Sequence, residues 1–169
     1  MSSIAYASSP VKDNWELAEE FKQYLNVDWL NLTVNNNNEV VVTGFFSDSL
    51  NVDSKQLFSD GGLDIFIAKF TQNKDLIWLK HAGGANVDFS KFINTDALNN
   101  IYIKGMFKGE ARFGTNILKS TTYEYFTAKF NDSGELLWVK TRHNMMDMQK
   151  KKNKKSDYAY SQQPNNSIK

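Results

Sequence analysis

The sequence predicts an all-β protein made of two tandem repeats of about 60 residues, each forming a four-stranded antiparallel blade of the β-propeller type. Two observations support this prediction. Stretches of closely similar sequence recur at a nearly constant spacing. Aromatic residues make up 14% of the 169 residues while proline occurs only twice, and this composition favours the pleated, half-buried surfaces of sheets over helices.

The repeat is clearest in three pairs of segments. Two of the pairs lie 60 positions apart and the third lies 61 positions apart, so the loop that follows the glycine of the third pair is expected to differ by one residue between the copies. The pairs are 64–70 with 124–130, 76–80 with 136–140, and 38–46 with 99–107.

The N-terminal segment, 1–25, is predicted to contain a helix at 14–25. An alternative is that this segment supplies the last strand of a preceding blade, because Trp15 stands 63 positions before Trp78. The helix is favoured, since apolar side chains recur at every fourth position and would form one stripe. They are Leu17, Phe21 and Leu25.

Each repeat is expected to form four short strands. The joints between them are rich in Asn, Asp, Ser and Gly, which suit turns. Strands that are apolar on both faces favour a blade covered on both sides over an immunoglobulin-like sandwich, whose strands alternate apolar and polar residues. The first repeat, 26–84, has its strands at 29–34, 39–46, 64–70 and 76–81, and the second, 85–144, has them at 89–95, 100–107, 124–130 and 136–141.

The second repeat is similar to a known family. Trp78, the glycines at 83–84 and Asp88 precede the segment 100–105, which is followed by the glycine-containing segment 109–114 and then by Phe126, Phe130 and Trp138. In this order they resemble the bacterial β-propeller repeat called the SBBP repeat. The resemblance covers about 26–144, and the first copy departs from it at 47–59, which lacks the Gly-x-Ala-x-Phe-Gly pattern of 109–114.

The resemblance implies an exported or cell-surface protein, located outside the cell or in the cell envelope. The expected function is a non-catalytic interaction or scaffold module and not an enzyme. The alternative is a fragment of a propeller-type carbohydrate-active enzyme or of a glycan-binding protein. Residues 5–7 resemble the small-residue end of a signal peptide, but the basic and apolar regions that precede such a site are missing, so no complete signal peptide is identified.

Two repeated pairs of acidic residues raise the question of a glycosidase-type carboxylate site. Asp28 recurs as Asp88, and Asp64 recurs as Glu124. Because they recur in register, we interpret them as hydrogen-bonding groups at turns and strand ends. The repeated lysines are interpreted as strand residues whose stems cover apolar surface. They are Lys69 with Lys129, and Lys80 with Lys140.

No catalytic, cofactor-binding or metal-binding residue is assigned from the sequence. The chain has no cysteine and only two histidines, and His81 and His143 do not stand at equivalent positions of the two repeats. Residues 48–53 offer oxygen ligands without the spacing of a calcium-binding loop. The glycine pairs at 61–62 and 83–84 are interpreted as turns.

Charge and hydropathy favour neither nucleic acid nor membrane insertion. The 20 Lys and Arg residues against 19 Asp and Glu residues give a net charge of +1, and no apolar run reaches the roughly 20 residues of a membrane helix. Residues 145–169 contain a lysine block at 150–155 and lack strand periodicity, so they are predicted to be a disordered tail. A nucleic-acid or acidic-membrane contact by the block is the less favoured alternative.

Two blades bury one shared interface and leave an outer face on each side. The helix can cover only one of these faces, and alternation along 65–70 and 125–130 predicts outer residues as apolar as those at the shared interface. We therefore expect the chain to self-associate or to dock with propeller blades outside this sequence, with a glycan or protein as further ligand. Trp78 and Trp138 are expected to be equivalent buried residues.

Overall fold

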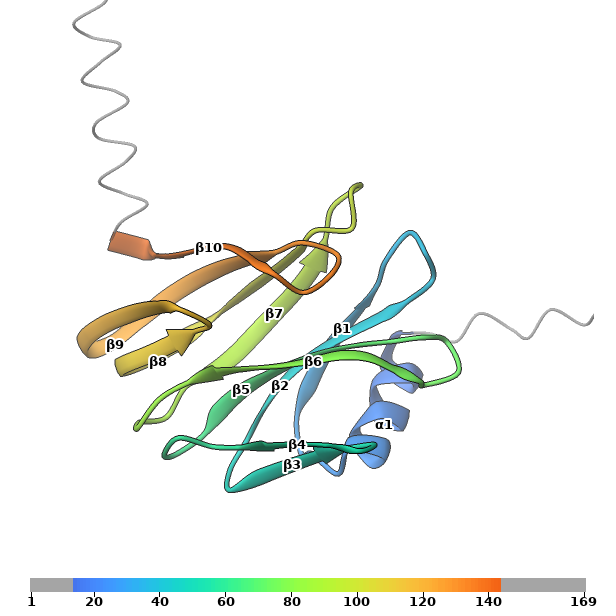
Figure 1. Ribbon diagram of the computed structural model, residues 1–169, viewed down its shortest axis with the longest axis horizontal. Coiled ribbons are helices and arrows are strands. Elements are labelled where there is room, and N and C mark those ends of the chain that lie inside the picture. Colours follow the sequence, from blue (N-terminus) through green and yellow to red (C-terminus); the bar gives the residue numbers. More distant parts are fainter. Residues whose placement is uncertain (1–13, 144–169) are drawn as a thin grey trace, which may run out of the picture.

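The structure is a computed structural model that describes residues 14–143, in which one helix, α1 (Asn14–Leu25), accompanies ten strands (Figure 1). Eight of the strands form two antiparallel four-stranded meanders. The first meander runs in the order β1 (Leu30–Val34), β2 (Val40–Phe46), β5 (Asp64–Phe70) and β6 (Leu76–Gly83). The second runs in the order β7 (Phe89–Thr95), β8 (Ile101–Phe113), β9 (Asn116–Phe130) and β10 (Leu136–Thr141).

The predicted antiparallel all-β fold with a short N-terminal helix is confirmed. Within residues 14–143 the two meanders pair with each other only through Ala82 with Phe113 and Gly83 with Arg112, and the strands do not close into a ring. Their identity as propeller blades therefore stays a prediction. The signal-like residues 5–7 and the predicted tail at 145–169 lie outside the described residues.

One region departs from the predicted strands. In the first repeat, β3 (Ser49–Val52) and β4 (Lys55–Phe58) form a separate hairpin where a loop is predicted. In the second repeat the corresponding region lengthens β8 and β9 into one long hairpin. Gly109 lies where the register of that hairpin shifts, and Gly114, with φ of 60°, lies in its turn. The glycines thus mark a bulge and a turn inside a hairpin.

Helix α1 covers one face of the first meander. The ring of Phe21 is 1% exposed and its centroid lies 5.0 Å from that of Phe70 in β5. The helix is followed by Asn26, whose left-handed backbone (φ 52°) suits a helix C-terminus. Tyr24 donates a hydrogen bond from its hydroxyl to the carboxylate of Asp53 at 2.5 Å, which ties the helix to the turn between β3 and β4.

The two meanders stack face to face in the same sense. Phe66 of β5 packs in the cluster that contains α1, whereas Ile65 and Ile67 pack in the cluster shared with the second meander. Phe126 of β9 is the repeat equivalent of Phe66, and it packs in the shared cluster against the first meander. The same side of each meander therefore covers the element that precedes it in the chain, and the opposite side points away from that element.

Candidate interaction surface

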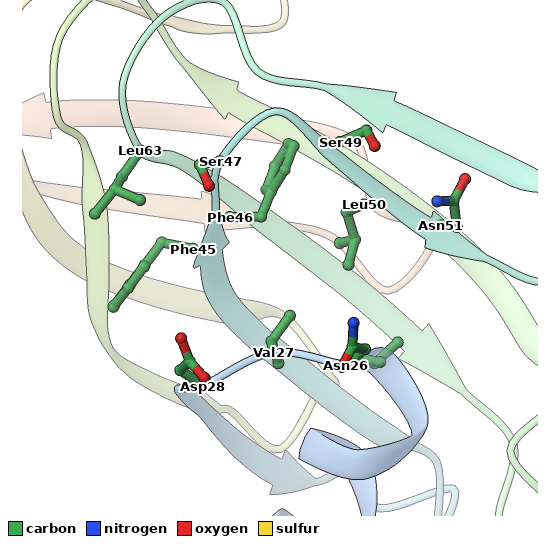
Figure 2. A pocket seen from close by; sticks show the side chains of 11 residues that line it. Asn26, Val27, Asp28, Phe45, Phe46, Ser47, Ser49, Leu50, Asn51 and Leu63 are labelled. Carbon is green, nitrogen blue, oxygen red and sulfur yellow. The ribbon is translucent and has the colours of Figure 1, made fainter.

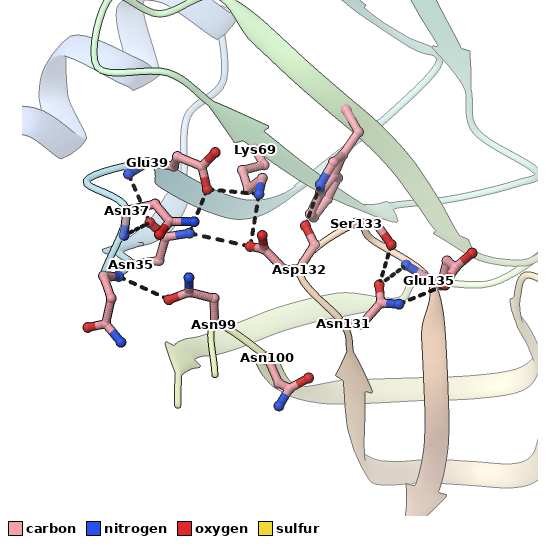
Figure 3. A network of polar contacts seen from close by, with 12 residues as sticks. Asn35, Asn37, Glu39, Lys69, Asn99, Asn100, Asn131, Asp132, Ser133 and Glu135 are labelled. Atoms are coloured by element: carbon pink, nitrogen blue, oxygen red, sulfur yellow. Dashed lines mark hydrogen bonds and ion pairs between the residues drawn. The ribbon is translucent and has the colours of Figure 1, made fainter. Parts of the chain in front are cut away.

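The contact between the meanders is organised by the turn that joins β9 to β10. Lys69 of β5 is buried, and its ammonium lies 2.8 Å from the carboxylate of Glu39 and 2.9 Å from that of Asp132 in the turn (Figure 3). Trp78 of β6 donates its indole N–H to the carbonyl oxygen of Asp132 at 3.2 Å. Burial lowers the pKa of Lys69, but the hydrogen bonds with Glu39 and Asp132 outweigh burial and hold this pKa above its usual range. The charged ammonium is thus paired within the interface.

A glycine allows this turn to approach Trp78 closely. Gly134 has a φ of 79°, and a Cβ added there would lie 2.9 Å from the indole ring of Trp78. Asn131 closes the turn, because its backbone oxygen accepts the Gly134 N–H at 3.0 Å and its side-chain oxygen accepts the Glu135 N–H at 2.8 Å. The Asn-Asp-Ser-Gly turn therefore places the Asp132 carboxylate next to Lys69 and the Asp132 carbonyl next to the Trp78 indole N–H. Gly134, which has no side chain, lets the turn backbone lie against the indole ring.

The same pair recurs on the second meander. Lys69 lies opposite Trp78 in the β5–β6 ladder, and Lys129 lies opposite Trp138 in the β9–β10 ladder, with a register shift beside each pair. Because Phe126, Ala128 and Phe130 fill the inner side of β9, Lys129 lies on the outer side. Tyr125 on that side is 50% exposed, so the face is open to solvent.

We call this outer side of the second meander the open face. The prediction that it is as apolar as the shared interface is wrong, because Tyr125 and Thr127 stand where the first meander has Ile65 and Ile67. Lysine ammonium groups lie 4.8 to 5.4 Å from the centroids of aromatic rings on this face, so ring and stem shield each other from water. The open face includes Phe92, Tyr102, Lys104, Tyr125, Thr127, Lys129, Trp138 and Lys140.

The two tryptophans are equivalent in position but not in burial. Trp78 is 8% exposed beneath the β9–β10 turn, as predicted. The prediction of burial is wrong for Trp138, which is only partly buried, because no turn within residues 14–143 lies over it. Lys129 forms an ion pair with Asp96, whose carboxylate lies 3.4 Å from the Lys129 ammonium and accepts the Tyr102 hydroxyl at 3.1 Å. Tyr102 and then Asp96 hold the pKa of Lys129 above its usual range.

Asp64 is fully buried and is saturated with hydrogen bonds. Its carboxylate binds His81 Nε2 at 2.8 Å and accepts the backbone N–H groups of Asp60 at 2.7 Å and Gly84 at 3.1 Å. Asp60, Asp64 and His81 bring three potential metal ligands within 4.8 Å of one another. This group was not predicted, because Asp60 belongs to no sequence motif. Both oxygens of Asp64 already have hydrogen-bond partners, so we interpret these three residues as a hydrogen-bonded cluster that stabilises the first meander.

Asp88 is fully buried, whereas its repeat equivalent Asp28 is exposed. Asp88 Oδ1 accepts the backbone N–H of Lys108 at 3.1 Å, and Oδ2 has no hydrogen-bond partner within the described residues. Burial raises the pKa of Asp88 to about 6; the Lys108 N–H opposes this and the charge of Asp64 adds to it. A carboxyl with no exposed surface cannot reach a substrate.

The remaining candidates are dispersed. Glu124, the equivalent of Asp64, lies 3.9 Å from the exposed His143. Residues 48–53 form β3 and the turn after it, and the Asp53 carboxylate accepts the Tyr24 hydroxyl. A cavity of about 330 Å³ lies between the end of α1 and β2 (Figure 2), and Asp28 is the single carboxylate among its lining residues. It therefore lacks the second carboxylate of a glycosidase site.

Comparisons with models of protein families and with curated proteins found no match to this chain. The resemblance to the SBBP repeat accordingly stays a prediction. Among the described residues, α1 is too short and too polar to cross a membrane. The distinguishing feature is thus geometric. The Lys69–Trp78 pair of the first meander binds the turn at 131–134, whereas the equivalent Lys129–Trp138 pair of the second meander has no such turn over it within residues 14–143.

Proposed function

We propose that this chain is a non-catalytic interaction or scaffold module, a partial β-propeller of two blades whose open face binds a further blade or another protein. The observation that carries the proposal is the stacking of both meanders in the same sense. The side of the first meander that contains Lys69 and Trp78 receives the second meander, and the open face is the same side of the second. A face built on that pattern is suited to receive another element of the same kind.

Charge favours a different partner over a second copy of this chain. Lys104, Lys129 and Lys140 lie on the open face, so two such faces brought together would oppose their lysines. The other end of the stack is covered by α1, which buries Phe21 against the first meander. A head-to-tail array of copies would require the helix to leave this position.

Selection of binders tests the proposal. Peptides selected from a displayed library on the immobilised full-length chain are expected to bind the open face, so Tyr125→Glu, at a residue 50% exposed, should abolish their binding. Phe58→Glu is the matched control, because Phe58 is 65% exposed on β4 and lies on the other half of the molecule. Selected peptides that are insensitive to Tyr125→Glu, or that depend on Phe58, contradict the proposal.

The SBBP resemblance adds a location to the proposal, outside the cell or in the cell envelope. Fractionation of cells that express the full-length gene product tests it. Recovery in the cytosol alone contradicts an exported location.

Glycan binding is the second candidate, favoured by one observation. Trp29 stacks on Phe45 with ring centroids 5.4 Å apart, and Phe89 lies edge-on to Phe45 at 6.4 Å. These rings line a groove of about 510 Å³ next to the cavity of Figure 2, and flat rings offer apolar surface to the C–H face of a sugar. A glycan array probed with the full-length chain tests this candidate, and signals that survive Phe89→Ala contradict it.

A further inference from the structure

We propose that the open face recognises an acidic β-turn of the Asn-Asp-Ser-Gly kind, carried on a blade-type hairpin of another polypeptide, with Lys129 and Trp138 as the binding pair. This inference rests on the proposed function and names the chemistry of its partner. The template is the contact already present between the two meanders, where Lys69 and Trp78 hold the turn at 131–134.

Three interactions define the template. The Asp132 carboxylate lies 2.9 Å from the Lys69 ammonium, its backbone carbonyl accepts the Trp78 indole N–H at 3.2 Å, and Gly134 lies flat against the indole. The ion pair selects a turn that carries a negative charge, and the directional hydrogen bond from the indole sets the orientation of that turn. Glycine is required because any larger residue would collide with the ring and would be strained at a φ of 79°.

The second meander repeats the binding half of this template. Lys129 and Trp138 are cross-strand partners, as Lys69 and Trp78 are, and Lys140 repeats Lys80, whose stem also borders Gly134. Within residues 14–143 the indole N–H of Trp138 makes no hydrogen bond, whereas that of Trp78 does. The Lys129 ammonium has Asp96 at 3.4 Å, longer than either contact of Lys69. The pair therefore keeps donors that an incoming turn can use.

The turns of this chain itself do not suit the open face of a second copy. The acidic turn at 131–134 is engaged within its own molecule. The equivalent turn of the first repeat has Gln72 and Lys74 in place of Asp132 and Gly134, and the Lys74 ammonium lies 3.2 Å from Glu20 of α1. The partner is therefore a different polypeptide that presents an acidic turn.

The test uses the full-length ¹⁵N-labelled chain and a cyclised hairpin peptide with the sequence of residues 124–141. Cyclisation is needed because an isolated hairpin is marginally stable in water. We expect the peptide to shift the indole N–H signal of Trp138 and to leave that of Trp78 unchanged. Replacing the acid within the peptide, Asp132→Asn, should weaken binding by about tenfold or more, the usual effect of losing one charge-assisted hydrogen bond.

Two variants of the chain locate the binding pair. Lys129→Gln should weaken peptide binding by about tenfold, and Trp138→Phe, which keeps an aromatic ring but removes the N–H, should weaken it several-fold. Lys55→Gln, at an exposed lysine of β4, is the control and should leave binding unchanged. The amide spectrum of each variant shows whether it is folded.

Absence of a Trp138 shift at millimolar peptide, equal binding of the Asp132→Asn peptide, or full binding by Lys129→Gln overturns this inference. The library experiment separates the two proposals. If library ligands require Tyr125 but still bind the Lys129→Gln variant, the proposed function is supported and the inference that the partner presents an acidic turn is contradicted. If no ligand of either kind depends on the open face, both proposals fail.

Discussion

Replacing Asp88 by Asn should change how the stability of the protein depends on pH. The pKa of Asp88 is about 6 in the folded chain against an ordinary value of 3.8. Because the folded pKa is raised, the folded state binds the proton more tightly than the unfolded state. Below about pH 4 Asp88 is protonated in both states and does not change the free energy of unfolding with pH. As the pH rises from about 4 to about 6, ionisation of Asp88 progressively lowers the free energy of unfolding.

The size of the effect follows from the shift. One pKa unit corresponds to about 1.4 kcal/mol, so a shift of about two units lowers the free energy of unfolding by about 3 kcal/mol above pH 6. Asp88 is fully buried, so solvent does not screen this cost. Asn keeps an oxygen for the Lys108 N–H, but its amide replaces Oδ2, which has no partner within the described residues. Leaving that amide unpaired costs about 1–3 kcal/mol at every pH.

The assay is urea unfolding of the wild-type chain and of Asp88→Asn between pH 4 and pH 8. The free energy of unfolding of the variant, relative to that of the wild type, should rise by about 2–3 kcal/mol between pH 4 and pH 8, whatever the difference between the two proteins at pH 4. Asp28→Asn is the matched control, because it changes the exposed equivalent of the same residue. Parallel pH profiles for wild type and Asp88→Asn would refute the reasoning, as would a carboxyl ¹³C titration of Asp88 with its midpoint near 4.

Four further substitutions test the packing of the two meanders. Trp78→Ala should lower the free energy of unfolding by about 3–5 kcal/mol and Trp138→Ala by clearly less, since Trp138 is partly exposed; equal losses in urea titrations contradict this. Tyr24→Phe removes the hydrogen bond to Asp53 and should cost about 1 kcal/mol, measured in the same way, with an unchanged midpoint as the opposing result. Burial raises the pKa of Glu39, but hydrogen bonds from Lys69 and Asn35 outweigh it and lower this pKa, so its stabilising effect is present above pH 4.5 and is lost as the pH falls through the folded value. Glu39→Gln should therefore reduce the loss of melting temperature on acidification from pH 5 to pH 3, and an undiminished loss speaks against the role of this pair.

The strands and the helix were predictable because their signals are local. The stripe of Leu17, Phe21 and Leu25 predicts α1 with the bounds that the structure has. The Asn, Asp and Gly clusters mark the turns, because these residues tolerate left-handed backbone, as Asn38, Asn99 and Gly134 do here.

The hairpin of β3 and β4 was not predicted, because its sequence signal is too short. Its strands are four residues each and alternate apolar and polar residues only over Ser49–Val52, which is too short a run to stand out from a loop. In the second repeat, Gly109 and Gly114 suggest a loop but lie in the bulge and the turn of one long hairpin. The same residue types serve both structures, so sequence pattern alone could not separate them.

The position of the open face was predictable from the repeat, but its chemical character was not. The 60-residue offset of the repeat places Lys129 and Trp138 at the positions equivalent to Lys69 and Trp78. The engaged state of the first pair was not predictable, because it depends on Asp132, which is 63 residues from Lys69 in the chain. The asymmetry between two nearly identical pairs arises only from the segments that pack on each.

The repeat, the strand positions, the turns and the equivalent residues can be read from local sequence, because backbone sterics and side-chain alternation act over a few residues. Three features depend instead on how the segments pack: which side of each meander is covered, the burial of Asp88 while Asp28 is exposed, and the hydrogen bond of Trp78 that Trp138 lacks within residues 14–143. Burial, charge pairing and desolvation depend on segments brought together from distant parts of the chain, so residues with the same local sequence acquire different surroundings and different chemistry.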